Sequence, residues 1–211
     1  MKTLAIDFST DRRAVHLDFG QRGPVTIFQF NRQVGALALI ETAFEKAGAE
    51  RSELERIVLG LGPGSYTGIR SAIALAQGWA LGTEVELVGA PSVDAIACGA
   101  AVQGEFVVVL DAQRGEFYTK YFRFNGDGAS ATSELRIQDR AAVEAAAKSG
   151  ARLVGPEVVK HFGGGDIVHP DPADLVRVLA KTDDKAMVGE LEPIYLRPTE
   201  FKKAPPARLI E

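Results

Sequence analysis

A glycine-rich segment near the middle of the first half of the chain has residue types that could bind an anion. The segment Gly62-Pro63-Gly64-Ser65 follows an apolar run from Ile57 to Leu61 and precedes a second apolar stretch. This order predicts a strand, a tight turn and a helix that Ser65 caps. Backbone amides at a helix start can bind a phosphate or a carboxylate, so Gly64 and Ser65 are candidate nucleotide- or anion-binding residues. The alternative is that the glycines only permit a sharp turn and close packing.

Two aspartates stand where a carboxylate could organise Mg²⁺ and phosphate. Asp7 and Asp111 each close an apolar run that is typical of a buried strand. They are therefore further candidates for nucleotide binding. Equally, both could be turn-forming aspartates whose carboxylates accept hydrogen bonds from nearby backbone amides.

The sequence predicts neither a catalytic constellation nor a metal site. The glycine segment lacks the Gly-Lys-Ser/Thr ending of a phosphate loop and the third glycine of a dinucleotide fingerprint. It also lacks the glycines that flank the serine of a nucleophile elbow. No two histidines have the i, i+4 spacing of a metal pair on a helix; the three are His16, His161 and His169.

The helix predicted after the glycine turn, Ile69 to Leu81, is apolar almost all round. Its strongly polar residues are Arg70, Ser71 and Gln77. Arg70 and Gln77 are nearly two turns apart and share one stripe of the helix with Ala74. The segment is too short to span a membrane. We expect it to be buried on more than one side, either entirely by its own chain or in part by a second lobe or another chain.

The elements that must position these residues begin with a three-strand meander. A helix from about Gln33 to Gly48 and alternating strands and helices follow, an order typical of a mixed sheet of the ribonuclease H type. Glu105 to Phe124 then resembles the opening strand, aspartate, turn and returning strand, which suggests a duplication or a chance similarity of two hairpins. Later predictions are a strand at Ser133–Ile137, a helix at Gln138–Ser149, a strand at Arg152–Val154, a loop at His161–Asp166, a brief strand at Ile167–Val168, a helix at Asp171–Lys181, and an extended end with a loose tail to Glu211.

Composition places the chain among ordinary globular proteins. It has 211 residues, of which 25% are charged and 46% hydrophobic, enough for one large or two small domains. The net charge of −4 argues against strong direct tRNA binding. The single cysteine, Cys98, excludes an intramolecular disulfide framework, and no targeting segment is visible. We expect a cytoplasmic protein without a membrane segment.

Four segments, taken in order, resemble the bacterial TsaB family, also called YeaZ. The resemblance implies an α/β fold of the actin, Hsp70 and sugar-kinase (ASKHA) type, with mixed sheets, a three-strand meander and flanking helices. It implies two ribonuclease-H-like lobes, residues 1–103 and a smaller lobe at 104–211 with an extended tail. The segments are Leu4-Ala5-Ile6-Asp7-Phe8-Ser9-Thr10, Gly62-Pro63-Gly64-Ser65-Tyr66-Thr67-Gly68-Ile69-Arg70, Asp111-Ala112-Gln113-Arg114-Gly115-Glu116 and Pro193-Ile194-Tyr195-Leu196-Arg197.

The resemblance also implies a role in tRNA modification. TsaB is the non-catalytic partner of TsaD, which transfers a threonylcarbamoyl group to N6 of adenosine 37 of tRNA. The implied partners are TsaD, TsaE in the assembled complex, and a second copy when the chain is alone. The implied cofactors are none of the chain's own, with ATP or ADP at the assembled complex. In the family the first two helices meet the partner; the residues this places at the interface are Leu37, Glu41, Phe44, Arg70, Ile73, Ala74 and Gln77.

One departure from the family and two rival functions stand beside this prediction. Family members often carry a histidine near the start of the first helix, where this chain has Asn31-Arg32-Gln33, which affects the details of the interface. The first rival is an ASKHA-type enzyme, a small-molecule kinase or a glycoprotease-like peptidase. For phosphate binding, the second lobe would offer such a kinase only Asp111 and Gly163–Gly165. The second rival, a protein that binds tRNA directly, conflicts with the acidic composition.

Overall fold

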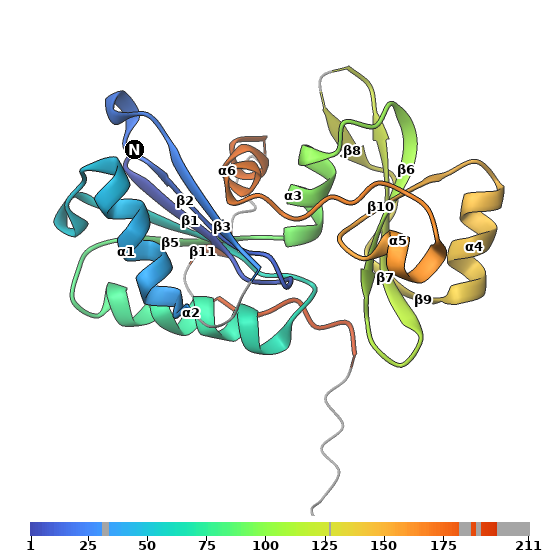
Figure 1. Cartoon of the computed structure of the whole chain (residues 1–211), viewed down its shortest axis with the longest axis horizontal. Coiled ribbons are helices and arrows are strands. Elements are labelled where there is room, and N and C mark those ends of the chain that lie inside the picture. Colours follow the sequence, from blue (N-terminus) through green and yellow to red (C-terminus); the bar gives the residue numbers. More distant parts are fainter. Residues whose placement is uncertain (31–33, 127, 182–186, 189–190, 198–211) are drawn as a thin grey trace, which may run out of the picture.

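Two mixed β-sheets with helices on both faces make up the chain (Figure 1). The computed structural model describes residues 1–30, 34–126, 128–181, 187–188 and 191–197. The predicted start of the first helix at Gln33, the last residue of the predicted extended end, Pro198, and the predicted tail that follows it lie outside these residues. Among the described helices, none is long and apolar enough to cross a membrane.

The first sheet has the strand order β11-β5-β4-β1-β2-β3. β1, β2 and β3 form the predicted antiparallel meander, whereas β4 and β5 run parallel to β1. Placing β4 and β5 beside β1 is the arrangement expected of a ribonuclease-H-like sheet. The strands are β1 (Thr3–Asp7), β2 (Arg13–Asp18), β3 (Val25–Gln29), β4 (Arg56–Gly60), β5 (Glu86–Ala90) and the short antiparallel β11 (Met187–Val188), with single 3-10 turns at Gly20–Arg22 and Arg51–Glu53.

Alternation along the strands gives the first sheet two different faces. Bulky residues such as Leu4 and Ile6 pack under α1 (Ala36–Ala47) and α2 (Tyr66–Ala80). Small residues such as Ala5 face α3 (Ser92–Gly99) and α6 (Pro172–Lys181). Because a small side chain lets a helix approach the sheet closely, Leu175 of α6 is completely buried there. As predicted, α1 ends at Gly48, whose left-handed conformation (φ 57°) stops the helix.

The second sheet repeats the opening pattern of the first. β6 pairs antiparallel with β7 and parallel with β10, as β1 pairs with β2 and β4. Both β8 and β9 pair with β7 on its other side. The elements are β6 (Gly104–Asp111), β7 (Glu116–Phe124), β8 (Ala129–Ala131), β9 (Arg136–Asp139), α4 (Arg140–Lys148), β10 (Arg152–Val154) and α5 (Val158–Phe162).

The chain passes between the two lobes more than once. α3 lies between the sheets, with Ala95 toward the first and Ile96 toward the second. After the second sheet is complete, the chain returns to the first lobe as α6 and β11 (Figure 1). The described part of residues 104–211 therefore contributes to both sheets. The lobe limits of 1–103 and 104–211 stay a prediction.

Several elements of the second lobe differ from the sequence prediction. His161 and Phe162, predicted in a loop, end the short helix α5. The strand predicted at Ser133–Ile137 overlaps β9 only at Arg136 and Ile137, and β8 lies before it. The strand predicted at 167–168 is absent from the described structure, where an isolated bridge joins Val154 to Asp166. These short segments depend on pairing partners far away in the sequence.

Candidate functional site

The glycine turn packs backbone against backbone on the turn that follows β1. A side chain at Gly64 would overlap the carbonyl oxygen of Ser9, and one at Gly68 would overlap that of Phe8. The amide of Ser65 donates to the Ser9 carbonyl at 2.7 Å, and Ser65 Oγ accepts from the Gly68 amide at 3.3 Å. Close packing therefore explains these glycines, and the Ser65 amide already has an acceptor within the chain.

Asp7 lies beneath this contact and is completely buried. Its Oδ1 accepts hydrogen bonds from the amide and the hydroxyl of Ser9, at 2.9 and 2.6 Å. Burial raises the pKa of Asp7, while hydrogen bonds from the Ser9 and Ser92 side chains partly offset that rise. Asp7 thus holds the turn on which the glycine segment packs, as the turn-forming alternative predicted.

Asp111 ends β6 and borders a cleft between the lobes. Its Oδ1 accepts from the Gln113 amide at 2.7 Å in the same type of turn. The cleft has a volume of about 440 Å³, and Gly64 and Ser65 line it from the first lobe. Three of the four candidate nucleotide-binding residues therefore border one cleft, whereas Asp7 lies below its floor. Their role in nucleotide binding stays a prediction.

A cluster of three possible metal ligands, which the sequence did not indicate, borders the same cleft. Glu157 lies beside Asp111 in the lining, and His161 lies next to both. The sequence contains no helical pair of histidines, and its pattern predicts a loop at His161. The i, i+4 spacing of Glu157 and His161 is the signal that could have indicated two ligands from one helical turn.

The seven predicted interface residues lie on or just under the outer face of α1 and α2. Arg70, Ala74 and Gln77 are exposed along α2. Leu37 on α1 is 49% exposed, and Glu41 is ion-paired with Arg51 at 2.6 Å. Two further candidates face the core, where 4% of Phe44 and 6% of Ile73 are exposed. The described part of the chain thus covers one side of α2 and leaves the other side exposed.

Tyrosines that the prediction did not include extend this face. The rings of Tyr66 and Tyr195 lie 5.7 Å apart, and the Arg70 guanidinium lies 5.2 Å from the centre of the Tyr66 ring. Tyr195 is brought here because the Ile194 amide donates to the Leu61 carbonyl at 2.9 Å. A groove of about 360 Å³ separates α2 from this segment; its lining is Arg70, Ile73, Ala74, Gln77, Leu191, Glu192, Pro193 and Tyr195.

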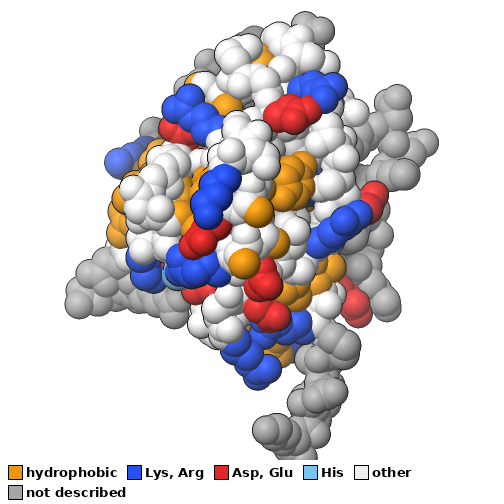
Figure 2. Space-filling model, turned by 90° about the vertical axis from the view of Figure 1, so that its right-hand side faces the viewer, with side chains coloured by type: hydrophobic (Ala, Val, Ile, Leu, Met, Phe, Trp, Pro, Cys, Tyr) orange, Lys and Arg blue, Asp and Glu red, His pale blue; other side chains and the backbone are white. Residues whose placement is uncertain are grey.

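The end of the molecule formed by the second lobe carries charges of both signs. Figure 2 shows Lys and Arg side chains interspersed with Asp and Glu there. Ion pairs such as Arg140 with Glu144 (3.6 Å) and Lys160 with Glu157 (3.0 Å) neutralise them locally. Among its described residues, this face has no continuous basic stripe of the kind that binds a phosphate backbone.

Comparisons with known proteins identify the family. Residues 29–172 match the model of the family described as TsaD, tRNA N6-adenosine threonylcarbamoyltransferase. The chain is also 25% identical to the tRNA threonylcarbamoyladenosine biosynthesis protein TsaB of Escherichia coli, over 97% of this chain and 99% of that protein. The chain belongs to the TsaB (YeaZ) group of this family.

Other TsaB proteins and a solved structure agree with this assignment. The TsaB protein of Haemophilus influenzae is 27% identical over 96% of both chains. The structure of YeaZ from Pseudomonas aeruginosa is 20% identical, has a TM-score of 0.70, and is matched over 85% of this chain and 90% of that chain. The predicted family and the predicted ASKHA-type fold with its mixed sheets and flanking helices are confirmed.

Proposed function

We propose that this TsaB-family chain is a non-catalytic accessory subunit in the synthesis of threonylcarbamoyladenosine at position 37 of tRNA. It binds TsaD, joins TsaE in the assembled complex, and acts in the cytoplasm. The names of its E. coli and H. influenzae relatives, tRNA threonylcarbamoyladenosine biosynthesis proteins, support the pathway. The observation that carries the partner role is the outer side of α2, which the described residues leave exposed.

The residue types on this face suit a protein partner. Ala74 stands between Arg70 and Gln77, and its small side chain lets a second helix approach closely. Tyrosine and arginine, here Tyr66 and Arg70, are among the residues that dominate binding energies at interfaces. At the far end of the helix, Leu81 is 91% exposed. The face therefore combines a small residue at its centre with larger side chains at both ends.

The same face serves a second copy of the chain when TsaD is absent. A dimer about a two-fold axis uses one patch on both subunits, so the patch must be complementary to itself. The neutral Ala74 and Gln77 at its centre meet that condition without like-charge repulsion. TsaD and the second copy then exclude one another, and the proportion of each complex follows from mass action.

Nucleotide has no assigned site within the isolated chain. The Ser65 amide, a candidate donor to phosphate, already donates to Ser9. Asp7 is buried below the cleft. ATP or ADP therefore belongs to the assembled complex in this proposal, and the chain needs no cofactor of its own for the accessory role.

Size-exclusion chromatography with light scattering tests the proposal on the chain alone and on its mixture with TsaD from the same cell. A heteromeric peak is expected. Ala74→Arg should weaken that complex and the homodimer at least about tenfold, because it places a charge in the centre of the interface. The matched control is Ala145→Arg, at an exposed position of α4 in the other lobe, which should leave both assemblies intact.

Two results would overturn the proposal. If no complex forms with or without nucleotide and TsaE, the chain is not a TsaD partner. If the purified chain alone phosphorylates a small molecule or cleaves a peptide, it is an ASKHA-type enzyme instead. If Ala74→Arg and Ala145→Arg form the complex equally well, the chain still binds TsaD, but the interface does not lie on α2.

A further inference from the structure

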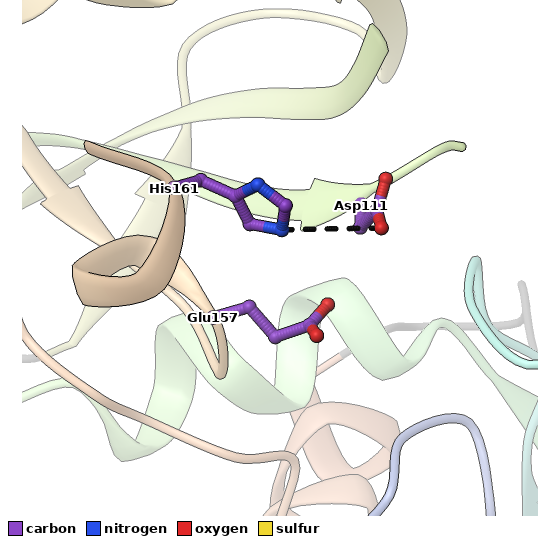
Figure 3. Close-up of side chains that lie close together, drawn as sticks. All are labelled: Asp111, Glu157 and His161. Carbon is purple, nitrogen blue, oxygen red and sulfur yellow. Dashed lines mark ion pairs between the residues drawn. The ribbon is translucent and has the colours of Figure 1, made fainter. Parts of the chain in front are cut away.

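Three side chains from two distant parts of the chain converge at one wall of the interlobe cleft (Figure 3). Asp111 comes from the end of β6, and Glu157 and His161 come from the turn of α5. One carboxylate oxygen of each acid and one ring nitrogen of the histidine lie within 4.8 Å of one another. His161 Nε2 is 3.9 Å from Asp111 Oδ2, and the Glu157 carboxylate extends toward the space between them.

Local structure holds each of the three in place. The His161 amide donates to the Glu157 carbonyl at 3.1 Å, which fixes the helical turn that puts both side chains on one side. The Asp111 carboxylate is oriented by the amide and side chain of Gln113, at 2.7 and 3.1 Å. The His161 ring packs edge-on against Phe117, with centres 5.2 Å apart. Such supporting contacts orient ligands and limit the entropy lost on binding.

One polar atom of the cluster, the ring nitrogen of His161 that faces the carboxylates, is not satisfied by the described residues. His161 Nε2 is buried and has no hydrogen-bond partner among the described residues. A buried ring nitrogen without a partner is costly, and two converging carboxylates repel one another. Lys160 donates to Glu157 Oε1 at 3.0 Å, so a single ammonium offsets two negative charges. A cation between the three side chains would relieve the remaining imbalance.

We propose that Asp111, Glu157 and His161 bind a first-row divalent transition-metal ion of the Zn²⁺ class. One imidazole and two carboxylates are ligands that Zn²⁺ accepts at about 2.0–2.2 Å, whereas Mg²⁺ and Ca²⁺ prefer oxygen alone. Tetrahedral ligands at such distances are about 3.3 Å apart, so the observed spacing requires only small side-chain rotations. Three protein ligands leave a fourth position for water or an anion.

The position of the three side chains determines what would surround this ion. Asp111 and Glu157 line the cleft, so the ion would lie at its wall, across from Gly64 and Ser65. It would place positive charge where the cleft otherwise presents two carboxylates. None of the three side chains belongs to the proposed TsaD interface, although Tyr66 and Tyr195 border both that face and the cleft.

Histidine-selective ¹⁵N NMR of the full chain tests the site directly, because the chain has only three histidines. Zn²⁺ is titrated alone into metal-free protein, and a chelator competition gives the dissociation constant. We expect His161 Nε2 to shift at one equivalent of Zn²⁺, with His16 and His169 unchanged, and a dissociation constant of about 1 μM or tighter. Binding weaker than about 1 mM, or a shift at His169 instead, would refute the site.

Variants distinguish Zn²⁺ binding by the three ligands from a general effect of negative surface charge. Glu157→Gln and His161→Gln should each weaken Zn²⁺ binding about 10- to 100-fold or more, since even outer contacts of metal sites contribute that much. Glu144→Gln removes a carboxylate from the same lobe outside the cluster and should bind like the original chain. Circular dichroism confirms that each variant is folded, and Asp111→Asn replaces any variant that is not. Equal affinity of Glu157→Gln and Glu144→Gln would overturn the assignment.

Discussion

Asp7 and Asp111 form the same turn at equivalent ends of the two sheets, but only Asp111 keeps access to the cleft. In each, Oδ1 accepts the amide of the residue two positions later, at 2.9 Å from Ser9 and 2.7 Å from Gln113. Asp7 is completely buried, whereas the Asp111 side chain is 19% exposed. One local motif therefore serves packing in the first lobe and remains accessible to ligands in the second.

Replacing Asp7 with asparagine should stabilise the fold in a pH-dependent way. Burial raises the pKa of Asp7 above its ordinary value of 3.8. The folded state therefore holds a proton that the unfolded state releases, so the original chain loses stability as the pH rises from 3.8 through the raised pKa. Asp7→Asn keeps an acceptor for the Ser9 amide and removes this loss. Thermal melts from pH 3 to pH 8 should show the variant's advantage growing with pH.

An advantage of Asp7→Asn that stays constant over this pH range would contradict the titration of Asp7. Asp18→Asn, near the other end of the meander, is the control. It should not reproduce the growth of the advantage with pH.

Two glycines of α2 should respond in opposite directions to alanine. A Cβ at Gly68 would overlap the Phe8 carbonyl, while a Cβ at Gly78 meets nothing within 4 Å. Gly68→Ala should therefore lower the free energy of unfolding by at least about 2 kcal/mol, since backbone must move. Gly78→Ala should raise it by roughly 0.5–1 kcal/mol, because alanine loses less entropy in a helix. Urea unfolding of the isolated chain measures both, and effects of the same sign would disprove the packing.

Phe44 should prove to be a core residue that reports on the packing of α1 against α2. Its ring stacks on Trp79 at 5.8 Å with an interplanar angle of 23°. Phe44→Ala should cost about 3–5 kcal/mol and expose the indole to water. Because Trp79 is the only tryptophan, its emission should shift to the red. Phe30→Ala, at a ring that is 64% exposed, should leave the emission unchanged and cost less than about 1 kcal/mol.

Glu53 should link the start of the chain to the turn before β4 through ion pairs that are lost at low pH. It forms ion pairs with Lys2 at 2.9 Å and Arg22 at 2.7 Å. The hydrogen bond from Arg22, with those from Glu50 and Lys2, lowers the pKa of Glu53 from 4.5 to about 2. Its contribution to stability is thus present above pH 4.5 and is lost as the pH falls through about 2.

Carboxyl ¹³C NMR would follow this titration of Glu53. Glu53→Gln should lower the melting temperature slightly at neutral pH, and less at high salt, because exposed pairs are screened. Glu45→Gln, at an exposed position of α1, is the control. A Glu53 carboxyl that titrates near 4.5 would contradict the ion-pair network.

Periodicity is enough to predict five of the six strands of the first sheet and its main helices. The meander, the turn before α2 and the end of α1 at Gly48 can be predicted locally. Strand alternation and helix caps each depend on only a few neighbouring residues. The missed elements are short and depend on tertiary pairing. α5 spans only Val158–Phe162, and β11 is two residues that pair with Val88 and Gly89. No local pattern specifies a strand of that length.

The candidate sites were predictable to different degrees. The polar stripe of Arg70 and Gln77 follows from helical spacing, and both residues are exposed as that stripe requires. The place of Tyr195 beside Tyr66 depends on a backbone contact with Leu61, which no spacing in the sequence indicates. The meeting of Asp111 with His161 likewise requires the path of the chain across the second sheet. Sequence patterns find residues on one element more readily than sites assembled from several.

The return of α6 to the first lobe determines the order in which the protein can mature on the ribosome. Leu175 of α6 joins Ala95 of α3 in covering the face of the first sheet that Ala5 and Val58 form, so part of this face stays uncovered until the last quarter of the chain has been synthesised. Amino-terminal domains usually fold first during translation. Here the amino-terminal lobe must wait for the carboxy-terminal one, and a nascent chain that stalls near residue 103 exposes an apolar surface to chaperones and proteases.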